Sequence, residues 1–348
     1  MKDKIFITGA NGFIGSHITE LFITNGFDVV CILRQDSNRK NIEHLKIKTF
    51  TGDITDLNAL TEAMKSCTFV IHCAAHVKDW GIYDDFYKTN VVGTLNVIKA
   101  CQANNIKNII ITGSISSYGE EDSKTVKNED SPYNPHYPYF LDKVFHSPFN
   151  FYRDTKALAT RTAIEYACKY NLNLTVLEPA WVYGEREFNT GFFEYLKTVK
   201  NGIKIMPGSK QNKFHVIYVK DLAKAYLAAF NHKLKGINRI IIGNKEADNM
   251  CKIFFSFCIK AGINPPYLVP KWIIYPIGFL LELVYKIFNV KTPPLLMRSR
   301  INMFYDNIEY GTSKSETMLN FKCDYSLENG IENTVNWYKL HNYIQETV

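Results

Sequence analysis

The 348-residue sequence contains no internal repeat, no low-complexity tract and no run of five or more like charges. These absences argue against solenoid architectures and disordered interaction tails. The 41 basic and 34 acidic residues give a net charge of +7 that is spread along the chain. Such a charge is a weak signal for nucleic acid, so we expect no nucleic-acid partner, and it suits anionic cofactors and anionic lipid surfaces equally well. Hydrophobic residues make up 46% of the chain, enough for a real core.

The eight cysteines include no CxxC pair and no Cys/His spacing suited to zinc, so we expect reduced, mostly buried thiols. His72 and His76 have a four-residue spacing, but on a strand end and a loop that spacing does not converge on one ion. We therefore expect no metal. The opening residues MKDKIFITGANG lack the apolar core of a signal peptide, and we expect a cytoplasmic location.

Short apolar, β-branched runs alternate with stretches of helical periodicity in the first half of the chain. The expected strands are 4–8, 29–33, 47–51, 69–73, 108–112 and 174–178, and the expected helices are 12–24, 56–66, 84–104 and 152–170. Strands that alternate with helices imply right-handed crossovers and a parallel sheet covered on both faces. We predict an α/β fold, a Rossmann doubly wound parallel sheet with a smaller C-terminal lobe.

The alternation becomes irregular beyond about residue 180, where a strand at 214–219, a helix from Lys220 and a strand at 239–242 are expected. We predict a first domain over 1–180, with elements returning around 214–245, and a second lobe over 181–348. Residues 115–150 form a loop too long for a simple connector, and loops of that length are usually functional.

Three glycines, Gly9, Gly12 and Gly15, lie where the first expected strand meets the first expected helix. At such a turn the backbone N–H groups of a helix N-terminus can approach a pyrophosphate closely. The position of the motif at the start of a strand–helix–strand unit predicts a dinucleotide site.

The end of the second expected strand discriminates between the two nicotinamide cofactors. An acid there binds the ribose hydroxyls of NAD and repels the 2′-phosphate of NADP. This chain has Leu33 followed by Arg34, and a guanidinium binds phosphate well. We predict that NADP(H) is preferred over NAD(H); an ordinary solvated basic loop is the alternative.

Four segments, TGANGFIGS, GDITD at 52–56, HCAA at 72–75 and NVVGT at 90–94, resemble the extended short-chain dehydrogenase/reductases of the NAD-dependent epimerase/dehydratase superfamily. The resemblance covers almost the whole chain. It implies that Asp53 binds the adenine amino group, that HCAA lines the dinucleotide, and that Asn90 helps to order the central helix and a proton-relay water. The expected cofactor-binding residues are Gly9, Asn11, Gly12, Phe13, Ile14, Gly15, Arg34, Asp53, Ile54, Ala74, Ala75, Asn90, Tyr152, Lys156, Pro179 and Val182.

The family resemblance also implies a catalytic Ser or Thr with a YxxxK motif. That motif occurs at Tyr139, Tyr152, Tyr267 and Tyr310. Tyr139 lies at a typical distance after Ser114, but Pro148 would interrupt its helix. Tyr152 opens an uninterrupted helical run, so we assign Ser114, Tyr152 and Lys156 as catalytic and interpret 139–150 as an insertion.

The spacing suits the chemistry, because residues four apart share a helix face and bring the Lys156 ammonium near the Tyr152 hydroxyl. A nearby cation favours the phenolate of a group whose ordinary pKa is about 10. Ser114 can hydrogen-bond the substrate oxygen, and Ser116 is a candidate helper.

The most hydrophobic stretch, 271–290, is a poor candidate for spanning a bilayer because it contains Pro276, Glu282 and Lys286. From Ile277 it predicts an amphipathic helix with a narrow polar stripe that includes Gly278. Its wide apolar face has three candidate destinations: the protein core, a substrate tunnel, or a membrane surface contacted through 272–288.

The C-terminal lobe resembles that of the 3β-hydroxysteroid dehydrogenase/isomerase group and its bacterial relatives that reduce β-keto acyl chains. The resemblance rests on VIYVKDLAKA at 216–225, on the hydrophobic helix followed by PPLLMRSRINM, and on the terminal TSKSETMLNFKCDYSLENGIENTVNWY. Glu178, Asn320 and the 139–150 insertion depart from the family pattern and are candidates for substrate contact. We expect an oxidoreductase that acts on a small hydrophobic keto or hydroxy substrate, with 139–150 and 277–288 walling its pocket.

Two alternatives remain open: a nucleotide-sugar epimerase or dehydratase, and a non-catalytic NADP-binding sensor. Nucleotide-sugar enzymes of this fold commonly carry an Arg where this chain has Phe214 and His215, and a sensor would not need the Ser–Tyr–Lys set. The resemblance further implies a homodimer.

Overall fold

A computed structural model describes residues 3–119, 125–188, 191–209 and 211–344. Its centre is a seven-stranded parallel sheet in the order β11-β6-β5-β4-β1-β2-β3. The strands are β1 (Lys4–Thr8), β2 (Asp28–Leu33), β3 (Lys48–Thr51), β4 (Phe69–His72), β5 (Asn108–Thr112), β6 (Asn173–Pro179) and β11 (Ile237–Ile242). The predicted α/β doubly wound fold is confirmed.

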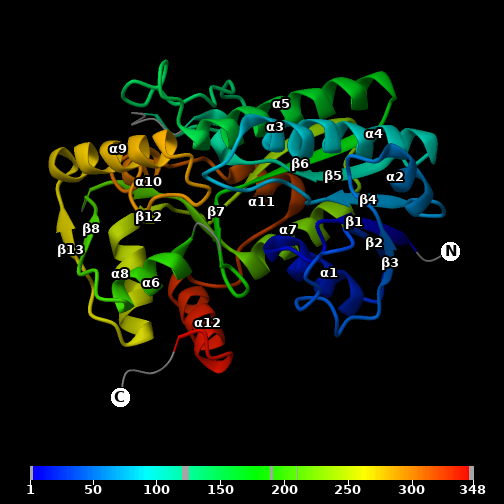
Figure 1. Ribbon diagram of the computed structural model, residues 1–348. Coiled ribbons are helices and arrows are strands. Elements are labelled where there is room, and N and C mark those ends of the chain that lie inside the picture. The colour runs from blue at the N-terminus through cyan, green and yellow to red at the C-terminus, as the bar shows by residue number, and fades with distance from the viewer. Residues whose placement is uncertain (1–2, 120–124, 189–190, 210, 345–348) are drawn as a thin grey trace.

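Helices cover both faces of this sheet, as a parallel sheet of apolar, β-branched strands requires. In Figure 1, α2 (Leu57–Ala63), α4 (Gly93–Ala103) and α5 (Pro148–Lys169) lie above the sheet, and α1 (Phe13–Thr24) and α7 (Val219–His232) lie below it. Two apolar clusters fill the layers, one on each side. The chain order reverses at β1, which pairs with β2 on one side and β4 on the other, and such switch points bind ligands at the carboxyl ends of the strands.

Several predicted elements differ in their bounds from the structure. Helix α5 begins at Pro148, not at residue 152, because proline is compatible with the first turn of a helix. The expected 139–150 insertion therefore ends at residue 147. The expected helix 84–104 comprises α3 (Tyr83–Phe86), a π-helical segment η1 (Tyr87–Val92) and α4.

The expected strand 214–219 also differs from the structure. It is divided between β9 (Lys213–Phe214), which pairs with β12 (Asp248–Asn249), and β10 (Val216–Tyr218), which pairs with β7 (Trp181–Tyr183). A third small sheet pairs β8 (Ile205–Pro207) with β13 (Tyr267–Val269).

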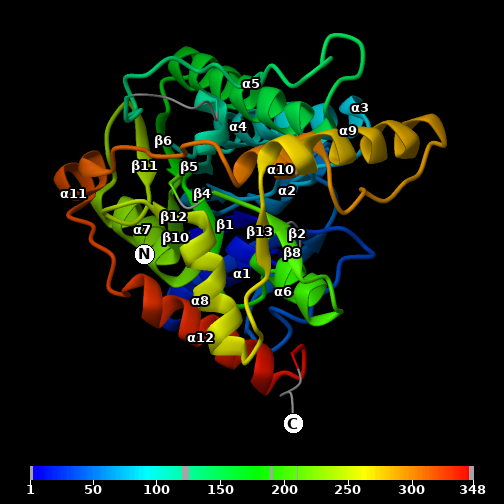
Figure 2. The ribbon, with the colours of Figure 1, turned by 90° about the vertical axis from the view of Figure 1, so that its left-hand side faces the viewer.

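The remaining helices follow one another after β7, and Figure 2 shows α8, α9 and α10 gathered beside the small sheets. They are α6 (Phe192–Lys200), α8 (Met250–Ala261), α9 (Lys271–Ile287), α10 (Arg298–Met303), α11 (Ser313–Leu319) and α12 (Leu327–Leu340). Helix α9 begins six residues before the expected start at Ile277 and includes Pro276. Among the described residues, no helix is long and apolar enough to cross a membrane.

Candidate active site and cofactor site

The turn between β1 and α1 is built from backbone that only glycine allows. Gly9 has a φ of +68°, and its carbonyl accepts the N–H of Gly12 at 3.0 Å. A Cβ on Gly9 would lie 2.7 Å from the nitrogen of Ala74, and a Cβ on Gly15 would lie 2.1 Å from the Gly9 oxygen. A side chain is therefore excluded at positions 9 and 15, and α1 starts directly at the sheet edge.

The N-terminus of α1 is suited to an anion. Gly12 is the N-cap and offers no side-chain acceptor, and the first turn carries no acidic residue. The free N–H groups and the positive end of the helix dipole thus face the sheet edge without a competing carboxylate. A pyrophosphate fits this cradle.

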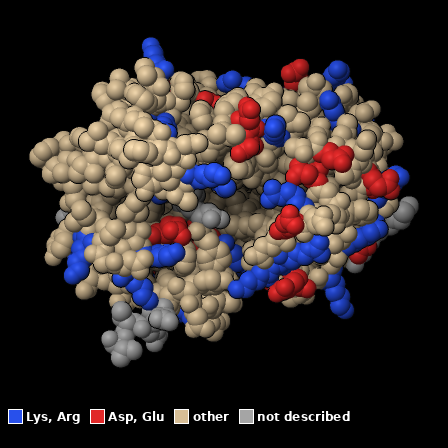
Figure 3. All heavy atoms as spheres, in the orientation of Figure 1, with Lys and Arg blue, Asp and Glu red and all other residues tan. Residues whose placement is uncertain are grey.

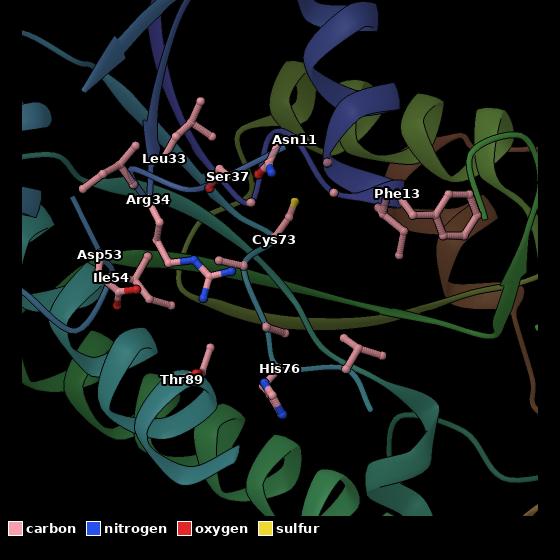
Figure 4. A pocket seen from close by; sticks show the side chains of 18 of the residues that line it. Asn11, Phe13, Leu33, Arg34, Ser37, Asp53, Ile54, Cys73, His76 and Thr89 are labelled. Carbon is pink, nitrogen blue, oxygen red and sulfur yellow. The ribbon is translucent and has the colours of Figure 1, made fainter. Parts of the chain in front are cut away.

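A cavity of about 580 Å³ opens at this edge (Figure 4), within the range of small-molecule and cofactor sites. It is lined by Gly9, Asn11, Gly12, Phe13, Ile14, Gly15, Ile32, Leu33, Arg34, Ser37, Gly52, Asp53, Ile54, Cys73, Ala74, Ala75, His76, Val77, Lys78, Thr89, Glu187 and Phe188. The structure thus brings together the expected cofactor residues from the glycine turn, the end of β2, the 53–54 turn and the HCAA segment. We call this space the cofactor cavity.

The end of β2 carries no acid, as the sequence indicates. Arg34 extends into the cavity beside Asp53 and Ile54 (Figure 4). Asp53 is held in place because its Oδ1 accepts hydrogen bonds from the backbone N–H and the hydroxyl of Thr55, both at 2.8 Å. One end of the cavity therefore offers a guanidinium, which favours anionic groups, and a fixed carboxylate, which favours hydrogen-bond donors.

Five expected cofactor residues lie outside this lining: Asn90, Tyr152, Lys156, Pro179 and Val182. Asn90 is buried in η1, where its Oδ1 accepts the N–H of His76 at 2.7 Å and its Nδ2 donates to Thr155 Oγ1 at 3.0 Å. It fastens the His76 backbone, which lines the cavity, to α5. Pro179 ends β6, and Val182 pairs with Ile217 in a small sheet.

Helix α5 carries Tyr152 and Lys156 one turn apart. The Lys156 ammonium donates to the carbonyl of Thr112 at 2.6 Å, so it lies at the carboxyl end of β5. Burial lowers the pKa of Lys156 to about 8, and the neighbouring Cys73 and Glu178 oppose that shift. Lys156 is thereby poised to gain or lose a proton near neutral pH.

Ser114 follows Thr112 by two residues and is buried at the start of the 3-10 helix η2 (Ile115–Tyr118). Its hydroxyl lies 2.7 Å from that of Ser116 and accepts the Ser116 N–H at 3.2 Å. The carboxyl end of β5 thus gathers a hydroxyl pair and a buried ammonium.

The competing YxxxK motif has a different geometry. Tyr139 and Lys143 lie in a turn segment outside any helix, and the Tyr139 ring packs 4.5 Å from that of Tyr137. Tyr139 and Lys143 therefore lack the shared helix face that the proton chemistry uses.

A second cavity of about 30 Å³ continues from the first, because Val77 and Lys78 line both. Its other lining residues are Asp79, Phe149, Trp181, Tyr195, Ser299, Arg300 and Met303. Five of these nine side chains are aromatic or apolar, and the others are Lys78, Ser299 and the ion pair in which Arg300 Nε donates to Asp79 Oδ2 at 2.6 Å. Ser299 Oγ is buried there without a hydrogen-bond partner among the described residues, so a polar ligand atom could pair with it.

The expected walls of this second cavity are partly wrong. Phe149 lines it, but Phe140 and Val144 are mainly exposed, and α10 takes the place expected for the helix at 277–288. The contribution of α6 had no motif to mark it, and α10 lies in the PPLLMRSRINM segment, which supported the family resemblance but was not expected at the pocket. Likewise His76, Lys78, Glu187 and Phe188 line the cofactor cavity without a sequence signal, apart from the position of His76 directly after HCAA.

The other singled-out residues have structural partners. His72 is buried between the hydroxyls of Thr8 and Thr94, at 2.7 and 3.0 Å, and burial lowers its pKa to about 3. The described residues contain no group of three or more His, Cys, Asp or Glu side chains that could hold a metal ion. His215 lies 2.6 Å from the Asn244 carbonyl.

Glu178 and Asn320, two of the departures from the family pattern, line neither cavity. The buried Glu178 carboxylate accepts hydrogen bonds from Tyr118, at 2.6 Å, and from Tyr133, and Arg239 Nε lies 3.6 Å away. Asn320 has a φ of 47° and caps α11. Both residues therefore have structural roles in this chain.

Known proteins resemble this chain along most of its length. A 2-alkyl-3-oxoalkanoate reductase from Shewanella oneidensis is 25% identical over 94% of this chain and 84% of its own. A sterol-4-alpha-carboxylate 3-dehydrogenase from Mus musculus is 24% identical over 95% of this chain and 90% of its own. A putative UDP-glucose 4-epimerase from Methanocaldococcus jannaschii is 29% identical over 97% and 99% of the two chains.

Among solved structures, the UDP-glucose 4-epimerase of Thermotoga maritima with UDP-glucose superposes with a TM-score of 0.76, at 21% identity over 97% of this chain and 99% of its own. The model of the NAD dependent epimerase/dehydratase family matches residues 5–243, which hold the glycine turn, the cofactor cavity and α5. Since that match spans more than half of the chain, the protein is an enzyme of the NAD dependent epimerase/dehydratase family, acting on CH–OH or C=O groups with a nicotinamide dinucleotide.

Proposed function

We propose that the protein is a reductase or dehydrogenase that uses NADP(H) and acts on a small hydrophobic keto or hydroxy compound of the steroid or β-keto acyl type. One observation carries the proposal: Phe149, Trp181, Tyr195 and Met303 line the space that continues the cofactor cavity, beside the Asp79–Arg300 ion pair, and this aromatic and apolar part of the lining favours an apolar ligand. The reductase and sterol dehydrogenase relatives support it. In this proposal residues 1–180 form the cofactor domain and 181–348 form mainly the substrate lobe.

Each catalytic side chain has a distinct task in this proposal. Ser114, with Ser116 beside it, donates a hydrogen bond to the substrate oxygen and polarises the carbonyl. Tyr152 donates the proton to that oxygen, and the Lys156 ammonium favours the phenolate left behind. The bound cofactor supplies the hydride. Thr112 fixes the ammonium through its carbonyl.

The preference for NADP(H) is supported by Arg34 in the cofactor cavity and by Leu33 where an acid would repel a 2′-phosphate. Asp53 remains the candidate for the adenine amino group. Ser37, three residues after Arg34, is a further candidate for phosphate because it lines the same cavity.

A homodimer is also proposed. Its support is the family resemblance together with the position of α4 and α5, which form the outer layer above the sheet (Figure 1). Sedimentation velocity of the purified chain gives the expected result if the mass is twice 40.1 kDa.

The nucleotide-sugar epimerase reading keeps one specific support, the putative epimerase relative at 29% identity. Against it stands His215, which is buried against the Asn244 carbonyl and the Tyr310 N–H where an Arg for the diphosphate is common. A sensor that only binds the cofactor would not need the buried ammonium of Lys156.

The experiment compares kcat/KM with NADPH across a homologous series of β-keto esters and a set of steroid ketones with activity on UDP-sugars. Each buried CH2 contributes about 0.8 kcal/mol, so each added carbon should raise kcat/KM by about fourfold until the pocket is full. A response that is independent of chain length, or turnover confined to UDP-sugars, would overturn the proposal.

A further inference from the structure

Helix α9 buries its polar stripe and exposes its apolar side. The buried residues Ile274, Gly278 and Glu282 repeat every four positions and form one side of the helix. A Cβ on Gly278 would lie 2.2 Å from Cδ1 of Ile301, so α9 and α10 are in close contact there. The predicted polar stripe is therefore the side that packs on the protein. Most of the apolar side chains of α9 are not buried in the protein core.

The polar groups of that stripe are paired inside the protein. Glu282 and Arg298 are both buried, with Arg298 Nη2 2.7 Å from Glu282 Oε1 and Arg298 Nε 2.9 Å from Oε2. The same guanidinium donates to the carbonyls of Phe140 and Phe145. Arg298 thereby fixes the 139–147 segment beside α9. These paired polar groups hold the helix with its polar stripe toward the protein.

The outward side of α9 and the neighbouring segment form one apolar surface. Phe140 of the segment contacts Phe279 of α9 with ring centroids 5.3 Å apart. The exposed members are Phe140, Leu141, Val144, Trp272, Ile273, Ile277, Leu280, Leu281, Val284, Ile287 and Phe288, with Trp272 and Phe288 about three-quarters exposed. We call this set the apolar face. Soluble monomers rarely expose so many contiguous apolar side chains unless something binds there.

The exposed charges beside the apolar face are basic, whereas Asp142 of the neighbouring segment and Glu282 of α9 are buried. From 270 to 300 the only acidic residue is Glu282, which Arg298 neutralises in the interior. The basic residues of this stretch are Lys271, Lys286, Lys291, Arg298 and Arg300. Lys286 and Arg298 pair with Glu282, Lys271 pairs with Asp306, and Arg300 pairs with Asp79. Lys143 in the neighbouring segment and Lys291 after α9 are exposed beside apolar members. In Figure 3 the end of the molecule where α9 lies in Figure 1 is largely free of acidic side chains.

We propose that the apolar face docks on a membrane containing anionic lipids, with α9 lying in the plane of the headgroup region. An apolar helix side with a tryptophan near one end, a phenylalanine at the other and flanking lysines is typical of interfacial helices. Lysines near an anionic leaflet add electrostatic attraction that a neutral partner would not provide. The docking itself does not depend on the proposed substrate.

The docked orientation brings the bilayer close to the second cavity. Helix α10, which packs on α9, contributes Ser299, Arg300 and Met303 to that cavity, and Phe149 follows the segment that Arg298 holds. Apolar molecules concentrate in lipid, so a surface next to the cavity would shorten their path.

The test uses the full chain with vesicles of phosphatidylcholine alone and of phosphatidylcholine with phosphatidylglycerol. We expect co-sedimentation with the anionic vesicles, at least tenfold weaker partitioning onto the neutral ones, and release at high salt. Acyl chains brominated near the headgroup should quench tryptophan fluorescence, and Trp272→Phe should remove most of that quenching. Equal partitioning onto both vesicles, or none, would overturn the proposal.

Matched variants make the test specific. Leu280→Glu places a charge in the apolar face and should weaken partitioning at least tenfold, whereas Leu340→Glu, at an exposed leucine of α12, should leave it unchanged. Lys143→Gln and Lys291→Gln should each weaken binding to anionic vesicles about fivefold. If Leu280→Glu instead turns a dimer into a monomer and vesicles never bind, a second copy covers the face and the proposal is wrong. Tyr152→Phe should bind vesicles like the wild type, which separates this result from the proposed activity.

Discussion

The cofactor cavity and the second cavity are built from different parts of the polypeptide. The first is shaped by backbone: a glycine turn, a helix N-terminus and the carboxyl ends of neighbouring strands. The second is shaped by side chains from α5, β7, α6 and α10, which lie far apart in the sequence. Few sequences can form a site that is shaped by backbone, so such a site leaves a recognisable motif. Many different apolar residues can line a site that is shaped by side chains. In the proposed function, the cofactor cavity provides the chemistry and the second cavity selects the substrate.

The largest effect is expected at Tyr152 of helix α5. Tyr152→Phe should lower kcat by about 10²- to 10⁴-fold because it removes the proton donor, while cofactor affinity stays nearly intact. Steady-state kinetics and cofactor titration measure both. Tyr139→Phe is the matched control, since Tyr139 lies outside a helix. An inactive Tyr139→Phe with an active Tyr152→Phe would show the assignment to be wrong.

Two apolar helices of the C-terminal half, α8 and α9, differ in how far their side chains are buried. Helix α8 buries Phe254 completely, whereas α9 leaves Leu280 more than half exposed. Phe254→Ala should lower the free energy of unfolding by about 3–5 kcal/mol. Leu280→Ala should change it by less than about 0.5 kcal/mol. Urea unfolding measures both, and a large loss at Leu280 would mean that its side chain is covered.

A substitution in the glycine turn tests whether backbone shapes the cofactor cavity. Gly15→Ala forces the Gly9 carbonyl to move, because the new Cβ would lie 2.1 Å from it. Affinity for NADPH and NADH should both fall by more than about tenfold, since the displaced N–H groups no longer face the pyrophosphate. Fluorescence titration measures this. Gly311→Ala, where the nearest atom is 3.6 Å away, should bind both cofactors normally.

A smaller effect is expected at Arg34. Arg34→Ala should weaken NADPH about tenfold and leave NADH nearly unchanged, because only the 2′-phosphate loses a charge-assisted hydrogen bond. Wild-type protein that binds NADH as tightly as NADPH would contradict the preference itself.

The pH dependence should be the mildest effect. Burial lowers the pKa of Lys156 to about 8 from an ordinary 10.5. The ammonium is the form that favours the phenolate, so kcat for reduction should decline as pH rises through about 8. Between that pH and 10.5 the unfolded chain binds more protons than the folded one, so this group's contribution to stability increases with pH. Lys156→Arg should move the decline in kcat to higher pH.

Much of the fold could be predicted from the sequence because its strands are short, β-branched and regularly spaced. β1 and β5 match the predicted residues, and the glycine turn lines the cofactor cavity as its spacing indicates. Pro148 misled the prediction of α5, since proline ends a helix interior but suits a first turn. The orientation of α9 could not be predicted. Periodicity distinguishes a polar and an apolar side of the helix, but it does not show that Glu282 of the polar side pairs with Arg298 in the interior.

The walls of the second cavity were the least predictable part. Ser299, Arg300 and Met303 reach it because α10 packs on α9, and the resemblance of these two segments to the family does not show how they pack. The expected roles of Phe140 and Val144 as pocket walls fail for the same reason, since Arg298 holds their segment against α9 on the outer surface.

The most direct test of the central claim follows the hydride in a single turnover. The enzyme would be mixed with NADPH carrying deuterium at the transferred position and with a hydrophobic β-keto ester or steroid ketone, and the product analysed by mass spectrometry. The account predicts one deuterium on the carbinol carbon of the hydroxy product for each NADPH oxidised. Interconversion of UDP-sugars with no net oxidation of the cofactor, together with no label in any hydroxy product, would contradict it.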